Sequence, residues 1–164
     1  MPVDVQSEIL IRCPRDVVAA YAANPDNAPE WYENIMSIEW RTSPPLAIGS
    51  RIAFTAQFLG RRLSYIYEIA EFAVGQRLVM RTKQGPFPME TTYTWSLGDD
   101  GMTRMTLRNR GVPSGFSILA APLMALGIRR ANRKDLKRLK DLLEGPASHA
   151  TVPPTRPEAK TKAL

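Results

Sequence analysis

Apolar and polar side chains alternate along most of the chain between residues 35 and 111, a pattern that predicts antiparallel strands with one buried face. The clearest hairpin joins the run 51–58 to a run that begins at Leu63, through a turn at Gly60-Arg61. In the last run, Arg104, Thr106, Arg108 and Arg110 alternate with Thr103, Met105, Leu107 and Asn109. The outer face of that strand is therefore expected to be cationic and its inner face mostly apolar.

Helical patterns flank these runs. A first strand over residues 3–12 is followed by short helical segments within residues 14–32, and helical spacing returns from Gly115 to Glu144, where Gly145-Pro146 ends it. The apolar stripe of the long helix consists of Ala125, Ile128, Asn132, Leu136, Leu139 and Leu143. Such a helix can bury its stripe on the concave face of the sheet. We expect an α+β fold, with a curved antiparallel sheet of six to seven strands wrapped around the C-terminal helix, two short helices after the first strand, and a cavity between helix and sheet.

Length and charge predict a single folded domain. At 164 residues, one core can bury most of the apolar surface, and we assign the domain to residues 1–144. Residues 1–128 carry twelve basic and twelve acidic side chains, so the net charge of +6 comes from residues 129–164. Residues 145–164 are rich in proline, lysine and threonine and poor in apolar side chains, which predicts a disordered tail.

The segment 115–128 is uncharged and almost entirely apolar. Its 14 or so residues fall short of the roughly 20 that a membrane span requires, so a buried or pocket-lining helix start is the main expectation and peripheral membrane contact the alternative. Pro122 should either kink this helix or mark its first turn. The N-terminus lacks the pattern of a secretory signal, and the lone Cys13 gives no reason to invoke an oxidising compartment, so we expect a cytoplasmic protein.

Several of these segments together resemble one known superfamily. The matching segments are the opening strand, Pro14–Tyr21, Asn24-Pro25-Asp26-Asn27, Glu30-Trp31, Phe58–Leu63, Glu68–Phe72 and the basic stretch Arg133–Lys140. Their order and spacing resemble the SRPBCC or START-like superfamily, which includes polyketide cyclases and dehydrases and the birch pollen allergen relatives. The resemblance covers residues 3–144 and implies a helix-grip fold. It does not select an activity, because the superfamily contains binding proteins, cyclases and coenzyme-linked regulators.

The residue types present limit the chemistry. The only histidine, His149, lies in the predicted tail, so the domain has no imidazole for acid–base work or metal ligation, and we expect no metal and no cofactor. No phosphate-binding loop or serine–histidine–aspartate set is present, and Cys13 lacks a histidine to activate it, which favours a structural cysteine. The polar candidates that remain are Tyr65, Tyr67, Glu68, Glu71, Tyr93, Asn109, Asn132 and Asp135, of which the two glutamates are expected to face solvent.

Strand alternation and the start of the long helix predict which side chains line the cavity. The candidate ligand-binding residues are Trp31, Phe54, Phe58, Tyr65, Tyr67, Met80, Tyr93, Trp95, Leu107, Asn109, Leu119, Leu123 and Met124. Each tyrosine could equally be a core ring or a group that orients a ligand. Asn109 and Asn132 fall on apolar faces, so they should bond each other, the nearby backbone or the polar end of a ligand.

Two functions fit this cavity. The first is binding or transport of a small hydrophobic ligand, such as a lipid, an isoprenoid or a polyketide. The alternative is a polyketide cyclase, aromatase or dehydratase in which tyrosine hydroxyls polarise a carbonyl and a carboxylate moves the proton. The absence of a histidine from the domain favours binding. The basic helix lacks interleaved aromatic residues, so we expect no nucleic-acid partner, whereas transient contact with a membrane surface stays open.

Overall fold

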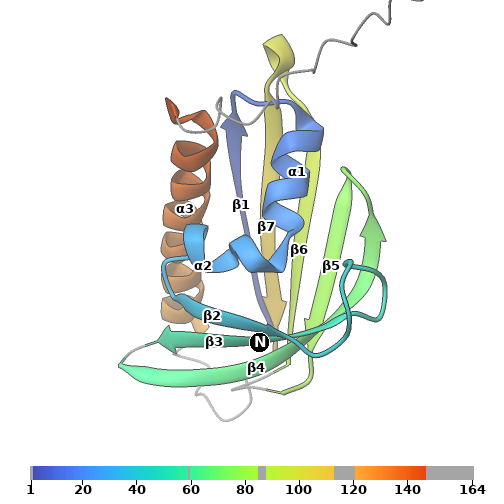
Figure 1. Cartoon of the computed structure of the whole chain (residues 1–164). Helices are drawn as coiled ribbons and strands as arrows, with labels where there is room; N and C mark the ends of the chain where they lie inside the picture. The colour runs from blue at the N-terminus through green and yellow to red at the C-terminus, as the bar shows by residue number, and fades with distance from the viewer. Residues whose placement is uncertain (1, 59, 85–87, 113–120, 147–164) are drawn as a thin grey trace, which may run out of the picture.

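Seven antiparallel strands form one sheet in the order β1-β7-β6-β5-β4-β3-β2 (Figure 1). The computed structural model describes residues 2–58, 60–84, 88–112 and 121–146. The strands are β1 (Val3–Ile11), β2 (Ile35–Trp40), β3 (Arg51–Phe58), β4 (Arg61–Ala73), β5 (Arg77–Thr82), β6 (Met89–Leu97) and β7 (Thr103–Gly111). The predicted sheet of six to seven strands is confirmed, and so is the β3–β4 hairpin, in which Phe58 pairs with Arg61.

Three short helical elements separate β1 from β2. They are α1 (Arg15–Ala23), the 3-10 turn η1 (Pro25–Asn27) and α2 (Ala28–Trp31). The side chain of Asn24 caps η1 by accepting a hydrogen bond from the Asp26 backbone N–H, and Pro25 occupies the first position of the turn. The long helix α3 covers Ala121–Glu144, so Pro122 stands in its first turn and Gly145 follows its end as predicted. The proposed start of this helix at Gly115 lies outside the described residues.

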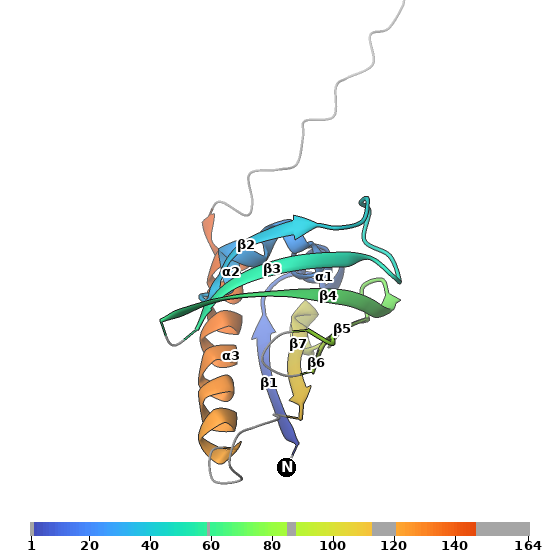
Figure 2. The same ribbon diagram turned by 90° about the horizontal axis from the view of Figure 1, so that it is seen from below.

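The sheet bends sharply. β2, β3 and β4 run at a steep angle to β1, β6 and β7, and they cross one end of α3 (Figures 1 and 2). The pairing of β4 with β5 shifts register between Ile69 and Glu71, where β4 leaves one part of the sheet for the other. Such a bulge increases the local twist and bends the strand. The concave side of this bend faces α1, α2 and α3.

The apolar stripe of α3 packs mainly against β1. Leu136, Leu139 and Leu143 are 1%, 0% and 5% exposed, as the helical spacing predicts. The C-terminal end of the helix is also joined to the end of β1, because the Arg12 backbone N–H donates to Glu144 Oε1 at 2.7 Å and the Cys13 thiol donates to the Leu143 carbonyl at 3.2 Å. Burial raises the pKa of the Cys13 thiol, which favours the neutral form that this contact needs.

The two faces of β7 follow the predicted alternation. On the outer face, the Arg108 guanidinium donates two hydrogen bonds to the Asp4 carboxylate, at 2.8 and 2.6 Å. On the inner face, Met105 and Leu107 are both 0% exposed. The register of the sheet, on which the inner and outer assignments depend, is therefore the one expected from the sequence.

The beginning of α3 differs from the prediction. Leu123 is 73% exposed and Leu126 is 64% exposed, so the expectation of a buried helix start is wrong for these two residues. One stripe of α3 faces β1, and Leu123 and Leu126 lie on the part of the helix surface that this contact leaves uncovered. No helix in the described part of the chain is long and apolar enough to cross a membrane.

Replacement of Leu139 by aspartate tests the packing of α3 against β1. The variant Leu139→Asp places an unpaired charge in a fully buried seam, which should lower the free energy of unfolding by about 3 kcal/mol or more. Leu142→Asp, at a position that is 41% exposed, is the matched control and should cost less than about 1 kcal/mol. Urea unfolding of both variants measures the difference, and equal costs would contradict the packing.

Candidate functional site

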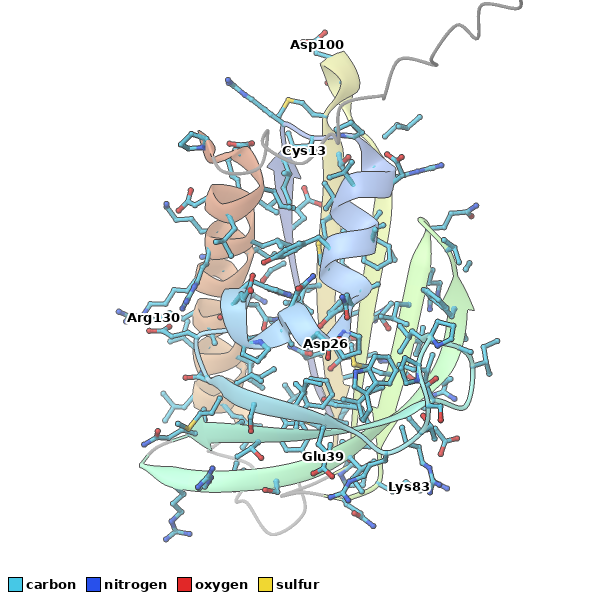
Figure 3. All side chains as sticks on the ribbon, in the orientation of Figure 1. Cys13, Asp26, Glu39, Lys83, Asp100 and Arg130 are labelled. Carbon is cyan, nitrogen blue, oxygen red and sulfur yellow. The ribbon has the colours of Figure 1, made fainter. Side chains whose placement is uncertain are left out.

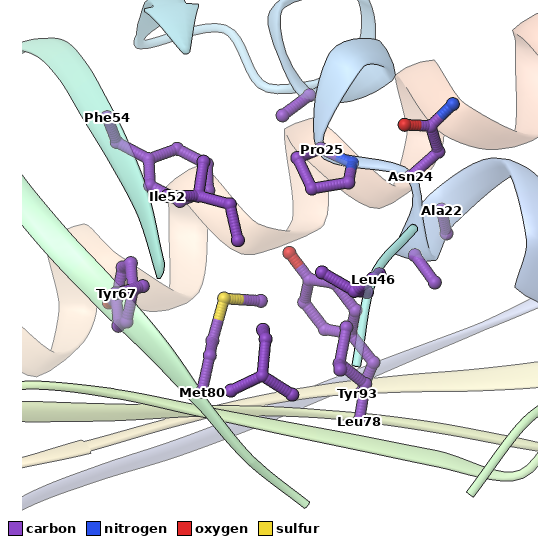
Figure 4. A pocket seen from close by; sticks show the side chains of 13 residues that line it. Ala22, Asn24, Pro25, Leu46, Ile52, Phe54, Tyr67, Leu78, Met80 and Tyr93 are labelled. Atoms are coloured by element: carbon purple, nitrogen blue, oxygen red, sulfur yellow. The ribbon is translucent and has the colours of Figure 1, made fainter. Parts of the chain in front are cut away.

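A small cavity lies between the concave face of the sheet and the α1–η1 segment (Figure 4). Its volume is about 20 Å³, and its wall is apolar except for two tyrosine hydroxyls and one asparagine. The lining residues are Ala22, Ala23, Asn24, Pro25, Ala28, Leu46, Ile52, Phe54, Tyr67, Ile69, Leu78, Met80 and Tyr93. Figure 4 shows the side chains of Met80, Leu46 and Tyr93 pointing toward one another across this space.

Aromatic rings surround Tyr93 at one side of the cavity. The Trp31 ring centroid lies 5.7 Å from that of Tyr93, and the Trp95 centroid lies 6.0 Å away on the same strand. Both pairs have edge-to-face geometry, which is favourable for aromatic rings. The Tyr93 hydroxyl forms a hydrogen bond with the hydroxyl of Tyr32, the residue that follows α2. Burial raises the pKa of both phenols, so they stay protonated at neutral pH.

A chain of hydrogen-bonded side chains runs from the sheet to α3, and we call it the polar relay. It consists of Tyr67 on β4, Thr91 on β6, Asn109 on β7 and Asn132 on α3, joined by contacts of 3.1, 2.9 and 3.0 Å. Of the partners expected for the two asparagines, namely each other, the nearby backbone or a ligand, the structure shows the first, since Asn109 Nδ2 donates to Asn132 Oδ1. Burial raises the pKa of Tyr67 to about 12, so its hydroxyl keeps the proton that the relay uses.

Asp135 is a buried carboxyl one turn beyond Asn132. It is 3% exposed, and its Oδ1 accepts a hydrogen bond from the Glu33 backbone N–H at 3.0 Å. Burial raises its pKa to about 6, against the opposing effect of the Glu33 hydrogen bond and of nearby Arg138 and Lys134. Its negative charge also contributes to the raised pKa values of Tyr32 and Tyr93, so the carboxylate lies close enough to both phenols to oppose their ionisation. A group of this kind can give or take a proton near neutral pH.

The structure brings most of the sequence-predicted residues to the concave side. Phe54, Tyr67, Met80 and Tyr93 line the cavity itself. A second group supports that wall without lining it, namely Trp31, Tyr65, Trp95, Leu107 and Asn109, which are buried or half-buried. Tyr65, for example, stacks on Phe54 with ring centroids 6.0 Å apart.

The remaining predicted residues lie elsewhere. By strand alternation Phe58 should face inward like Phe54. It is, however, the last residue of β3 and is 48% exposed, so it does not line the cavity. Leu123 is exposed at the start of α3, Met124 is half-buried, and neither lines the cavity. Leu119 lies outside the described residues. Strand and helix periodicity predicts a face, but it carries no information on how far along that face the core extends.

Sequence reasoning missed two kinds of functional residue. The first is the wall built by the α1–η1 segment and Leu46, for which no periodic signal exists in so short a stretch. The second is Tyr32; Asp135 is among the polar candidates taken from the sequence but not among the candidate ligand-binding residues. Asp135 falls three residues after Asn132 and four before Leu139, so the spacing of the apolar stripe would have identified it as buried. Glu68 and Glu71 are exposed, as expected.

The opposite face of α3 is strongly basic. Arg129, Arg130, Arg133, Lys134, Lys137 and Arg138 are all exposed on it, and Figure 3 shows Arg130 pointing away from the sheet. Contact of this face with a membrane surface stays a prediction. Among the residues that the structure describes, no three histidine, cysteine, aspartate or glutamate side chains come together as a metal site.

The chain is similar to one known protein family over almost the whole of its folded part. The family model described as polyketide cyclase / dehydrase and lipid transport matches residues 2–144. The chain belongs to this family. The match confirms the START-like resemblance, and it spans the cavity wall, the polar relay and Asp135.

Several solved structures share the fold of this chain. The Zhui aromatase/cyclase from Streptomyces sp. R1128 is 14% identical with a TM-score of 0.71, over 88% of this chain and 94% of that chain. A START superfamily protein from Mycobacterium smegmatis is 12% identical with a TM-score of 0.71, over 85% and 98%. The protein TTHA0849 from Thermus thermophilus is 20% identical with a TM-score of 0.69, over 84% and 94%. At these identities the likeness shows the helix-grip fold alone. No curated protein shows significant sequence similarity to the chain.

The raised pKa of Asp135 predicts a pH dependence of stability. The pKa of Asp135 in the folded state, about 6, lies above the value of 3.8 for an unperturbed group, so the folded state favours the protonated carboxyl. The stability of the fold that depends on this protonated form is complete below pH 4 and is lost as the pH rises through 6. Asparagine does not titrate, so Asp135→Asn does not lose stability over this pH range. Its amide oxygen can still accept the hydrogen bond from the Glu33 backbone N–H. The variant should therefore gain stability relative to wild type between pH 4 and pH 7, by up to about 3 kcal/mol. Urea unfolding across that range measures the gain, and a difference independent of pH would contradict the burial of a titrating carboxyl.

Proposed function

We propose that the protein binds a small hydrophobic ligand between the sheet and its covering helices. The observation that carries the proposal is the composition of the cavity wall, in which apolar side chains surround the hydroxyls of Tyr67 and Tyr93. Apolar walls with a few polar groups for orientation are the usual composition of small-molecule sites. The match to a family described by polyketide cyclisation and lipid transport supports the same class of ligand.

The volume of the cavity sets a condition on binding. A space of about 20 Å³ holds one water molecule, whereas ligand sites usually measure at least about 300 Å³. The wall must therefore move when a ligand enters. The side most able to move is the one formed by the α1–η1 segment and Leu46, since the opposite side consists of hydrogen-bonded strands. The side chain of Met80, on β5, points into the space between the two sides (Figure 4), and a methionine side chain can repack at low cost.

Enlarging a side chain in the cavity wall tests this proposal. Ala23, the last residue of α1, is half-buried and lines the cavity, whereas Ala20 on the same helix is exposed. Ala23→Phe should weaken the binding of an apolar, uncharged fluorescent probe, such as Nile red, at least about tenfold because the new ring occupies the site. Ala20→Phe adds the same ring on the solvent side and should leave probe affinity unchanged.

Fluorescence titration of wild type and both variants gives the comparison, with thermal melts to confirm that each is folded. Saturable binding at one site per chain that only Ala23→Phe weakens supports the proposal. Equal affinity in all three proteins, or no saturable binding by wild type, would contradict it.

A second function, cyclisation or dehydration of a polyketide-like substrate, is favoured by one observation. Asp135 is a buried carboxyl with a pKa of about 6 in the same electrostatic environment as the Tyr32–Tyr93 hydroxyl pair. In such a reaction the phenols would donate hydrogen bonds to a substrate carbonyl, and the Asp135 carboxylate would remove a proton from the adjacent carbon.

Turnover distinguishes this second function from binding alone. If the protein catalyses the reaction, it should convert a poly-β-keto thioester to a cyclised product, and Asp135→Asn should lower the rate at least about a hundredfold while the substrate still binds. Product formation is followed by liquid chromatography with mass spectrometry. A rate in Asp135→Asn equal to that of wild type would remove Asp135 from the chemistry, and no product with the wild-type protein would leave binding as the function.

A further inference from the structure

The polar relay has a direction that its hydrogen bonds determine. Thr91 Oγ1 donates its only proton to Asn109 Oδ1, so the Tyr67 hydroxyl must be the donor to Thr91. With its oxygen occupied by Thr91, Asn109 presents Nδ2 to α3 and donates to Asn132 Oδ1. Asn132 is therefore held with its oxygen toward the sheet, and its Nδ2 is the end of the relay.

That terminal amide nitrogen has no hydrogen-bond partner among the described residues. Asn132 is 4% exposed, and its Nδ2 is buried. An unpaired buried donor costs about 1–3 kcal/mol, and a leucine at this position of the apolar stripe would avoid the cost. The rest of the relay keeps the asparagine from turning this nitrogen toward Asn109.

The other unpaired groups in the interior are of the same kind. Besides Asn132 Nδ2, the buried side-chain atoms without a partner in the described part of the chain are Trp31 Nε1, Trp95 Nε1 and Ser7 Oγ. Both indole nitrogens and the amide nitrogen can only donate, and the serine hydroxyl can donate as well. The two indoles belong to rings that flank Tyr93, which lines the cavity. All four unpaired buried side-chain atoms in the described part of the chain can therefore donate a hydrogen bond, and three of them can do nothing else.

We propose that Asn132 is a ligand-orienting residue that donates a hydrogen bond from Nδ2 to a carbonyl oxygen of an otherwise apolar ligand. This inference rests on the proposed binding function and specifies the ligand class, an apolar ketone in preference to a plain hydrocarbon. A carbonyl oxygen has two lone pairs and no proton, so it complements the unpaired donors. A hydrocarbon of the same shape would leave every one of them unpaired.

A matched pair of ligands isolates the carbonyl. The ketone 2-acetonaphthone and the hydrocarbon 2-isopropenylnaphthalene have nearly the same shape, with a methylene in place of the oxygen. Titration calorimetry gives the affinity of each for the full chain, and the ratio of the two affinities is the measured quantity. Because both ligands share the naphthalene ring, a general change in the cavity affects both and cancels in the ratio.

The variant Asn132→Leu removes the donor. The ratio of ketone to hydrocarbon affinity should fall about five- to tenfold, the factor for one hydrogen bond of ordinary net strength. Arg133→Leu, the same replacement at the next and exposed position of α3, is the matched control and should leave the ratio as in wild type. If Asn132→Leu fails to fold, the double variant Asn109→Leu/Asn132→Leu removes both amides together, so that neither amide is left facing a leucine, and the same fall is expected.

The outcomes are distinct. A ratio that falls in the Asn132 variants and not in Arg133→Leu supports the inference. A ratio unchanged in the Asn132 variants overturns it while the proposed binding function stands, because both ligands still bind. Failure of wild type to bind either ligand overturns the proposed function and this inference together.

Discussion

The packing of α3 on β1 is the contact on which the rest of the structure depends. β1 and β2 are the two edges of the sheet, and the sharp bend brings the β2 side across one end of the helix. α3 covers the β1 edge with Leu136, Leu139 and Leu143, and Asp135 binds the backbone of Glu33, just before β2. One helix thereby joins both edges and encloses the concave side. Because the helix closes the concave side, the aromatic rings, the polar relay and the Asp135 carboxyl are all buried in the same interior.

The parts of the fold that could be predicted from the sequence are those in which burial imposes a period. In β7, alternation separates Arg108, which binds Asp4 outside, from the fully buried Leu107 inside, because a slip of one residue would exchange the two. In α3, three- and four-residue spacing identifies the seam leucines. The contact between Asn109 and Asn132 follows from both periods, since each amide falls on an otherwise apolar face and can be satisfied by the other.

The candidate site was less predictable, for physical reasons. Periodicity assigns a face, whereas the depth of burial depends on which segments cover it, so Phe58 at the end of β3 and Leu123 at the start of α3 were expected inside and are exposed. The cavity wall at Ala22 to Ala28 and at Leu46 depends on tertiary contacts of short segments. The size of the cavity depends on how side chains such as Met80 fill it, and composition does not determine that.

The central claim is that a ligand occupies the interior between sheet and helix, and intermolecular nuclear Overhauser effects test it most directly. With the methionine methyl groups labelled with carbon-13, Met80 reports on the cavity at 6% exposure and Met36 on the outer surface at 55%. In the presence of saturating 2-acetonaphthone, contacts should appear between the naphthalene protons and the Met80 methyl group and be absent from Met36. Contacts with Met36 and none with Met80 would contradict the account.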